Sequence, residues 1–278
     1  MTCEEWTLSG HRGVELFART WLPAGDVPRD VIVIAHGYAE HGARYGNLVD
    51  RLVPLGYAVH TVDHRGHGRS GGPRGMIDRL ATVVDDFHQF VARVRARHGE
   101  RRVKLIGHSM GGAVAFSYAL KHQADLSGLI LSGPAIGGKV PRAQGFLLKA
   151  LSALAPGMGT LALPPEGVSR DPAVVSAYTS DPLVYRGKLP ARTAGELVAT
   201  SLTSTARAGA ITVPTLIQHG TGDVLIPADG NAAVYAAIGA SDKTVRLYDG
   251  LAHEIYNEPE RDQVIGDLIA WLEQHPAA

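Results

Sequence analysis

Short apolar runs recur along the chain, and most of them end in glycine and a polar residue. The alternating segment at residues 14–22 and the one before it predict a starting hairpin. The later runs are continuous and rich in β-branched residues, at 30–37, 57–68, 103–112, 126–135, 213–223 and 244–253. Continuous runs of this length are typical of strands that are covered on both faces, so we predict a mostly parallel sheet.

Segments with apolar residues at helical spacing lie between these runs, at 44–56, 78–99, 112–122 and 260–275. Two of them stop at Gly56 and Gly99, which is a common way for a helix to end. Alternating strands and helices predict an α/β sandwich with right-handed crossovers.

One long stretch breaks this alternation. From about residue 137 to 206 there are helical pieces, prolines and small residues but no convincing strand. We predict an inserted helical cap (lid) over 137–206 that divides the core into residues 1–136 and 207–278. The cap would cover the carboxyl edge of the sheet, where ligands bind in open α/β sheets.

Composition narrows the class of protein. Apolar residues make up 45% of the 278 residues and charged residues 19%, the balance of an ordinary globular enzyme. Lys+Arg and Asp+Glu both number 27, so no charge excess favours nucleic acid as a partner. The single cysteine, Cys3, fits a reducing compartment. No signal peptide is visible, and the apolar stretch at 145–164 is too interrupted for a membrane span, so we expect a cytoplasmic protein.

The strand-to-helix turn at residues 107–111 has the pattern G-x-S-x-G around Ser109. In this context the pattern predicts the nucleophile elbow of the α/β-hydrolase fold, and an incidental serine in a glycine-rich turn is the alternative. So sharp a turn requires a strained backbone at Ser109. Larger side chains at Gly107 and Gly111 would collide with the adjacent strand and helix.

A serine nucleophile needs a base, and the chain order in this fold is Ser, then Asp or Glu, then His. Of 13 histidines, those that follow Ser109 are His122, His219, His253 and His275. His122 lies inside a helical pattern, His219 ends a buried strand, and His275 is in the C-terminal tail. His253 lies in the loop after the last strand, so we predict that it is the base.

The acid that orients the base should lie in the loop after the strand that comes before the last one. Asp223 lies in that loop. Its carboxylate would fix the tautomer of His253 and stabilise the imidazolium. Asp249 and Asp229 are the competing acids. Asp249 is more typical of a turn residue, and Asp229 is more typical of a helix N-cap.

The oxyanion of an acyl-transfer intermediate needs fixed N–H donors. One is expected at Met110, directly after the nucleophile, and one at Tyr38 in the loop after an earlier strand. Gly37 would allow close approach of that backbone. His36 is expected to support the loop, with a second catalytic base as the alternative.

Residues 63–72 include Asp63, His64 and His67, which raises the question of a metal site. The spacing matches no standard zinc pattern and includes no cysteine. We therefore interpret the segment as a tight structural loop and expect no metal.

The chain resembles the monoacylglycerol lipase family, most closely its bacterial, mycobacterial-type members. The resemblance lies in "HGYAEHGARY", "DHRGHGRSGG", "GHSMGG", "YTSDPLVYRG", "HGTGDVLIP" and "GLAHEIYNEPER" and extends over nearly the full length. It implies an α/β-hydrolase that releases glycerol and a fatty acid from monoacylglycerols without a cofactor.

The resemblance also implies roles for particular residues. The catalytic triad would be Ser109, Asp223 and His253, and the oxyanion N–H groups those of Tyr38 and Met110. The residues that would recognise the glycerol end are Glu40, Arg44, His108 and Tyr178. The alternatives are an ion pair between the first two and simple packing of the tyrosine in the cap.

Several functions remain open at this point. A lysophospholipase, a broad-specificity carboxylesterase, an acyltransferase or a non-catalytic ligand receptor could share the fold. Dehalogenases and epoxide hydrolases require an aspartate at position 109 and are set aside. The apolar segment at 145–155, with Phe146, Leu147 and Leu151, predicts either a lipid-contacting entrance or a core helix under the cap.

Overall fold

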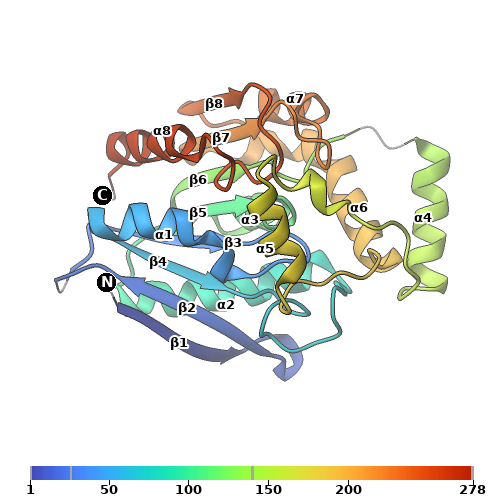
Figure 1. The fold of residues 1–278 in the computed structure, drawn as a ribbon, viewed down its shortest axis with the longest axis horizontal. Helices are drawn as coiled ribbons and strands as arrows, with labels where there is room; N and C mark the ends of the chain where they lie inside the picture. The colour runs from blue at the N-terminus through green and yellow to red at the C-terminus, as the bar shows by residue number, and fades with distance from the viewer. Residues whose placement is uncertain (1, 26, 139–140, 277–278) are drawn as a thin grey trace.

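An eight-stranded sheet runs through the protein in the order β1-β2-β4-β3-β5-β6-β7-β8 (Figure 1). The computed structural model describes residues 2–25, 27–138 and 141–276. The strands are β1 (Thr2–Ser9), β2 (Glu15–Leu22), β3 (Asp30–Ala35), β4 (Tyr57–Val62), β5 (Val103–His108), β6 (Leu126–Ser132), β7 (Thr215–Gly220) and β8 (Lys243–Tyr248). The β1–β2 and β2–β4 pairs are antiparallel and the others are parallel, which confirms the starting hairpin and the mostly parallel sheet.

Helices cover both faces of this sheet. They are α1 (Gly46–Leu52), α2 (Leu80–Arg97), α3 (Met110–His122), α4 (Arg142–Leu154), α5 (Pro172–Ser180), α6 (Ala191–Arg207), α7 (Ala228–Ala237) and α8 (Arg261–Gln274). Short 3-10 turns are η1 (His11–Gly13), η2 (Gly42–Tyr45), η3 (Val53–Leu55), η4 (Gln123–Asp125), η5 (Pro165–Gly167) and η6 (Ala208–Ala210). Within the described part of the chain, no helix combines the length and apolar character needed to cross a membrane.

The two covered faces explain why the strands are apolar throughout. In β3, Val31 and Val33 pack into a core shared with α2 and α3, whereas Ile32 and Ile34 pack into a core shared with α1 and α8. All four side chains are fully buried. A strand buried on both faces has no place for polar residues, so the alternating pattern is lost.

The segment 137–206 connects β6 to β7 and holds α4, η5, α5 and most of α6. Among its described residues the only β-type pairing is the bridge between Gly159 and Pro190, as the sequence predicts. Figure 1 shows α4 at the edge of the molecule, with α6 between it and the rest of the fold. Leu189 and Ala194 join the main core and so attach the segment to the sheet.

The parallel strands β3, β5, β7 and β8 all end at the same edge of the sheet. The loops that follow these strands carry Tyr38, Ser109, Asp223 and His253, respectively. Residues far apart in the sequence therefore meet at one place, the carboxyl edge where ligands bind in such sheets.

Candidate active site

Ser109 forms the sharp turn between β5 and α3. Its backbone has φ 55° and ψ −120°, a conformation that residues other than glycine rarely adopt. The N–H of Ser109 donates to the carbonyl of Ser132 (3.0 Å), and its own carbonyl accepts from Ala113 (3.2 Å) and Ala135 (2.9 Å). These bonds hold the strained turn in place, as expected of a functional residue.

The glycines on either side of Ser109 are required by space. A Cβ on Gly111 would lie 2.0 Å from the carbonyl oxygen of Ala35 in β3. A Cβ on Gly107 would lie 2.5 Å from the Cβ of Ala115 in α3. The collisions predicted from the sequence are therefore present in the structure.

His253 and Asp223 form a buried pair. Nδ1 of His253 lies 2.6 Å from Oδ2 of Asp223, and both side chains are almost fully buried. The other oxygen, Oδ1, accepts the N–H groups of Leu225 (2.9 Å) and Ile226 (2.8 Å). Burial alone would raise the pKa of Asp223, but hydrogen bonds from His219 and His253 hold it well below its ordinary value. An ionised Asp223 accepts a hydrogen bond from the Nδ1–H of His253, so Nε2 is the nitrogen that is free to act as the base.

The two competing acids lie in a turn and in a helix, respectively. Asp249 accepts a hydrogen bond from the hydroxyl of Thr221 (3.2 Å) in the turn before His253. The N-cap predicted at Asp229 is wrong, because α7 begins directly after Pro227 and places Asp229 in its first turn. There the carboxylate interacts with the helix dipole instead of capping the helix.

Ser109 and His253 line the same narrow cavity. Its free volume is about 30 Å³, room for only a few water molecules. The residues that line it are Gly37, Tyr38, Glu40, His108, Ser109, Leu163, Pro164, Pro165, Val168, Tyr178, Leu225, His253 and Glu254. The rings of His108 and His253 lie 4.6 Å apart between centroids. Among the described residues, the side-chain hydrogen bond of His253 goes to Asp223, and none joins it to Ser109.

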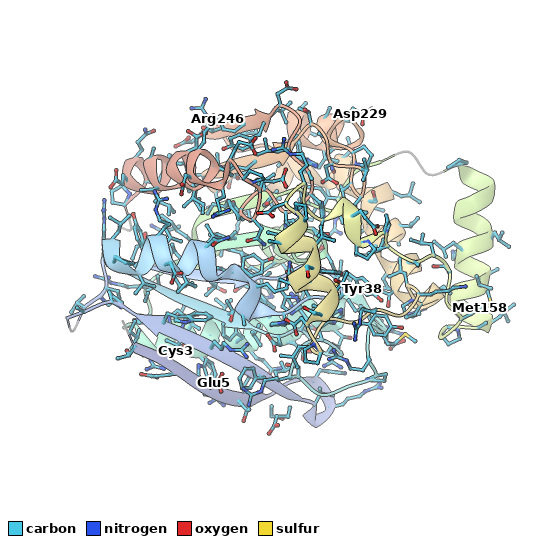
Figure 2. All side chains as sticks on the ribbon, viewed as in Figure 1. Cys3, Glu5, Tyr38, Met158, Asp229 and Arg246 are labelled. Carbon is cyan, nitrogen blue, oxygen red and sulfur yellow. The ribbon has the colours of Figure 1, made fainter. Side chains whose placement is uncertain are left out.

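The loop after β3 carries Tyr38 to the edge of this cavity. Gly37 donates its N–H to Oε1 of Glu40 (2.6 Å), and Ala39 has a positive φ of 71°. Met110 is the first residue of α3, so its N–H has no partner within the helix. Figure 2 shows Tyr38 close to α5, in the middle of the view.

His36 serves as a bridge between two loops. Its Nε2 accepts the N–H of His64 (2.8 Å), and its Nδ1 donates to the carbonyl of Gly37 (2.7 Å). Burial holds the pKa of His36 well below its ordinary value. With both ring nitrogens occupied, His36 supports the loop and is not placed to act as a second base.

The segment 63–72 has the structural role predicted for it. The two oxygens of Asp63 accept the N–H groups of Gly42 and Arg69, both at 2.9 Å. Burial lowers the pKa of His64 to about 3 and that of His67 to about 4. Both rings are therefore neutral and part of the core.

A different group, His88, His122 and Asp125, brings three possible ligand atoms within 4.8 Å of one another. The two imidazole rings stack 3.8 Å apart at an angle of 7°. Ligand lone pairs in nearly parallel ring planes do not converge on one ion. Arg95 already lies 2.5 Å from Oδ1 of Asp125. We therefore assign no metal to this group.

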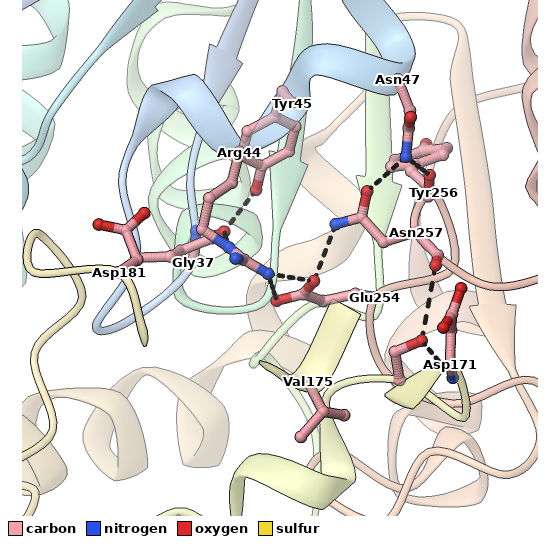
Figure 3. Close-up of polar contacts among 12 residues, drawn as sticks. Gly37, Arg44, Tyr45, Asn47, Asp171, Val175, Asp181, Glu254, Tyr256 and Asn257 are labelled. Carbon is pink, nitrogen blue, oxygen red and sulfur yellow. Dashed lines mark hydrogen bonds and ion pairs between the residues drawn. The ribbon is translucent and has the colours of Figure 1, made fainter. Parts of the chain in front are cut away.

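A buried polar network lies beside the cavity (Figure 3). Arg44 donates to Glu40 (3.2 Å) and, through one nitrogen, to both oxygens of Glu254 (2.7 and 3.0 Å). The Arg44 guanidinium lies over the ring of Tyr178, 4.8 Å from its centroid. Burial lowers the pKa of His108 to about 3, so this ring is neutral. The ion pair and the packing contact proposed as alternatives are both present at the edge of the cavity.

The contacts of three buried residues in this region were not predicted from the sequence. His219 lies 3.1 Å from Oδ2 of Asp223, Glu254 pairs with Arg44, and Glu258 contacts the loop of His253. His219 and Asp223 are four residues apart, a spacing that could have drawn attention to this pair. The other two contacts depend on how distant loops meet.

The chain is similar to known hydrolases over most of its length. The family Hydrolase_4, described as "Serine aminopeptidase, S33", matches residues 26–260. A monoacylglycerol lipase from Mycolicibacterium smegmatis is 40% identical over 276 residues, 99% of this chain and 98% of that protein. The Homo sapiens monoglyceride lipase is 31% identical, covering 95% of this chain and 89% of the relative. A Paleococcus ferrophilus monoacylglycerol lipase structure has a TM-score of 0.83 at 28% identity, covering 94% and 99% of the two chains. The chain therefore belongs to this α/β-hydrolase family, together with the monoacylglycerol lipases that its motifs resemble.

Proposed function

We propose that the protein is a serine hydrolase that cleaves monoacylglycerols to glycerol and a free fatty acid. The observation that carries the proposal is the position of Ser109, on a strained turn that lines the same cavity as the buried pair of His253 and Asp223. A relative named monoacylglycerol lipase, 40% identical, and one named monoglyceride lipase, 31% identical, both over nearly the whole chain, support the choice of substrate.

The reaction proceeds in two steps through an acyl-enzyme. Ser109 Oγ attacks the ester carbonyl while Nε2 of His253 accepts its proton. The N–H groups of Tyr38 and Met110 bind the negative oxygen that forms. His253 then gives the proton to the departing glycerol alkoxide, and the ester bond breaks. Water repeats the attack on the acyl-enzyme and releases the fatty acid.

The polar network beside the cavity is suited to the glycerol end of the substrate. Glu40, His108 and Tyr178 line the cavity of Ser109 and combine hydrogen-bonding groups with an aromatic face. Arg44 contacts Glu40 and the ring of Tyr178 from beside the cavity. A neutral His108 can donate or accept, as a hydroxyl partner requires.

Residues 137–206 act as a cap that must move for substrate to enter. A cavity of about 30 Å³ cannot contain a monoacylglycerol. One side of its wall comes from Leu163, Pro164, Pro165, Val168 and Tyr178 of this segment. Displacement of these residues would open the route to Ser109.

The proposal extends to the cap, which contacts lipid at its exposed surface. The protein is then cytoplasmic and binds reversibly to a lipid surface. Among the described side chains of the cap region, the large apolar ones that are exposed are Leu147, Leu154, Met158, Leu161 and Leu202. Figure 2 shows Met158 near α4 at the edge of the molecule. Of the residues predicted for this role, Leu147 is exposed, Leu151 is half-buried, and the side chain of Phe146 lies outside the described part.

A double variant tests this lipid contact. Leu147→Ser with Leu154→Ser should reduce hydrolysis of micellar substrate and binding to vesicles, while leaving a short soluble ester unaffected. Val245→Ser, which removes an exposed apolar side chain on β8, is the matched control. Equal losses on both substrates would contradict a role in lipid contact.

A hydrolysis panel tests the substrate itself. Monoacylglycerols, diacylglycerols, lysophospholipids and short esters are compared by product release under the same conditions. The proposal predicts the highest kcat/KM with monoacylglycerols. Preference for lysophospholipids or equal rates on all esters would favour the alternative enzymes, and no turnover would favour a receptor.

A further inference from the structure

Glu258 is a buried carboxylate with four hydrogen bonds from two different parts of the chain. Oε2 accepts the N–H of Ala252 (2.9 Å) and Nε of Arg170 (2.6 Å). Oε1 accepts the hydroxyl of Ser169 and the N–H of Arg170, both at 2.6 Å. The side chain of Glu258 has no exposed surface. One carboxylate therefore connects the residue before His253 to the cap.

A second contact ties the residue after His253 to the same part of the cap. The N–H of Glu254 donates to the carbonyl of Val168 at 2.7 Å. Ala252 and Glu254 are thus both held by residues 168–170. His253, which lies between them, has its backbone fixed from both sides.

Residues 168–170 belong to the cap segment that covers Ser109. Val168 lines the cavity directly. Ser169 accepts the N–H of Asp171 (3.0 Å), which is the N-cap residue of α5 (Figure 3). Helix α5 carries Tyr178 to the cavity wall. A shift of α5 would therefore act on Glu258 through Ser169.

The hydrogen bonds to Glu258 keep its buried carboxylate ionised. Burial alone would raise its pKa, but the N–H of Ala252 and the contacts with Arg170 and Ser169 hold it below its ordinary value. Removal of one partner from such a group leaves a buried charge or an unpaired donor, which is strongly unfavourable. The four contacts are therefore expected to form and break together.

We propose that Glu258 is a positioning residue, which holds His253 in its catalytic position only while residues 168–170 of the cap are docked against it. The inference rests on the proposed function, in which His253 is the base. It assigns Glu258 no contact with substrate. Glu258 acts through Ala252 on the one side and through Ser169 and Arg170 on the other.

Glu258→Gln is the direct test, with Glu260→Gln as the matched control. Glu260 also pairs with Arg170 but is exposed and does not contact Ala252. In Glu258→Gln the amide N–H₂ must face one of the donors. Because this displaces the base His253 slightly, kcat on a short soluble ester should fall about 10- to 100-fold. KM should stay within about twofold of the wild-type value. Glu260→Gln should stay within about twofold of wild type in both constants.

A proton signal provides a readout that does not depend on substrate. The Nδ1–H of His253, 2.6 Å from Asp223, should give a low-field NMR resonance, assigned by its absence in His253→Ala. Glu258→Gln should shift or broaden this resonance, and Glu260→Gln should not. Wild-type kcat together with an unchanged resonance in folded Glu258→Gln would overturn the inference.

Two further outcomes are distinguishable. If Glu258→Gln does not fold, Arg170→Gln is the second test. The inference then requires that Arg170→Gln lowers kcat about 3- to 10-fold and shifts the His253 resonance. Wild-type kcat and an unchanged resonance in Arg170→Gln would overturn it. If wild type hydrolyses no ester, the proposed function fails, whereas the shift of the His253 resonance in Glu258→Gln still tests the positioning.

Discussion

The carboxylate of Glu40 accepts the backbone N–H of Gly37 at 2.6 Å, one residue before Tyr38. The same carboxylate accepts the hydroxyl of Tyr45 (2.8 Å) and Nε of Arg44 (3.2 Å). Glu40 therefore fixes the loop that is proposed to supply an oxyanion N–H. This positioning of the loop is a second role for Glu40, beside the glycerol recognition proposed above.

Glu40→Gln separates these two roles. The amide must turn an N–H toward one of its present donors, so the loop shifts and oxyanion binding weakens. We expect kcat to fall about 10-fold or more on both a monoacylglycerol and a short ester that has no glycerol group. Steady-state kinetics on the two substrates check this, with Asp50→Asn, an exposed carboxylate on α1, as control. A loss confined to monoacylglycerol would assign Glu40 to glycerol recognition alone.

Gly111→Ala should disrupt the turn at Ser109. The added Cβ would lie 2.0 Å from the carbonyl oxygen of Ala35, and backbone on both sides must move. We expect destabilisation of about 1–3 kcal/mol or more, with loss of most activity. Gly266→Ala in α8 is the matched control, because nothing lies within 4 Å of its added Cβ. This control should be stabilised by about 0.5–1 kcal/mol, and similar urea midpoints for the two variants would contradict the account.

His219 contacts the same oxygen of Asp223, Oδ2, that accepts the hydrogen bond from His253. Its Nδ1 accepts the hydroxyl of Tyr235 (2.6 Å), and its Nε2–H is shared between Asp223 (3.1 Å) and the carbonyl of Ile226 (2.8 Å). His219→Phe leaves these partners unpaired, so we expect a loss of about 1–3 kcal/mol in stability and about 10-fold in kcat. His219→Gln offers a donor and an acceptor at similar positions and should stay closer to wild type. Equal losses in the two variants would show that the hydrogen bonds of His219 are not what supports Asp223.

Acid should destabilise the protein through its buried histidines. Burial lowers the pKa of His64 to about 3, His67 to about 4 and His108 to about 3, from an ordinary value of 6.5. The unfolded chain therefore binds protons first as the pH falls. The stability that the neutral rings provide is complete above about pH 6.5 and is lost progressively as the pH falls toward about 4 for His67 and about 3 for His64 and His108.

Urea denaturation at a series of pH values measures this loss. Each of these histidines should add a slope of up to about 1.4 kcal/mol per pH unit below pH 6.5. His67→Asn can still donate to the carbonyl of Arg65 but cannot titrate, so its slope should be smaller than that of wild type by about this amount. A free energy of unfolding that is constant from pH 7 to 5 would contradict the prediction.

The sequence predicted what depends on local pattern and chain order. Continuous apolar runs identified strands such as β3, whose residues are buried on both faces. The elbow at Ser109 was predictable because its glycines are adjacent in sequence, and His253 because it follows the last strand. The position of Asp229 was wrong by part of a helical turn, because helix starts depend on local capping geometry.

The contacts that sequence reasoning missed join distant segments. Ser169 and Glu258 are 89 residues apart, and Arg44 and Glu254 are 210 apart. No periodicity or spacing relates such residues, since their meeting depends on how the cap and the loops of the sheet pack together. The buried charges of this region are therefore visible only in the folded protein.

The central claim is that Ser109 is the nucleophile activated by His253. A fluorophosphonate probe, followed by intact mass and peptide mapping, tests it most directly. The account predicts one adduct on the peptide that contains Ser109, absent in Ser109→Ala and strongly slowed in His253→Ala, together with loss of glycerol release from monoacylglycerol in both variants. An adduct on another residue, or hydrolysis that persists in Ser109→Ala, would contradict the account.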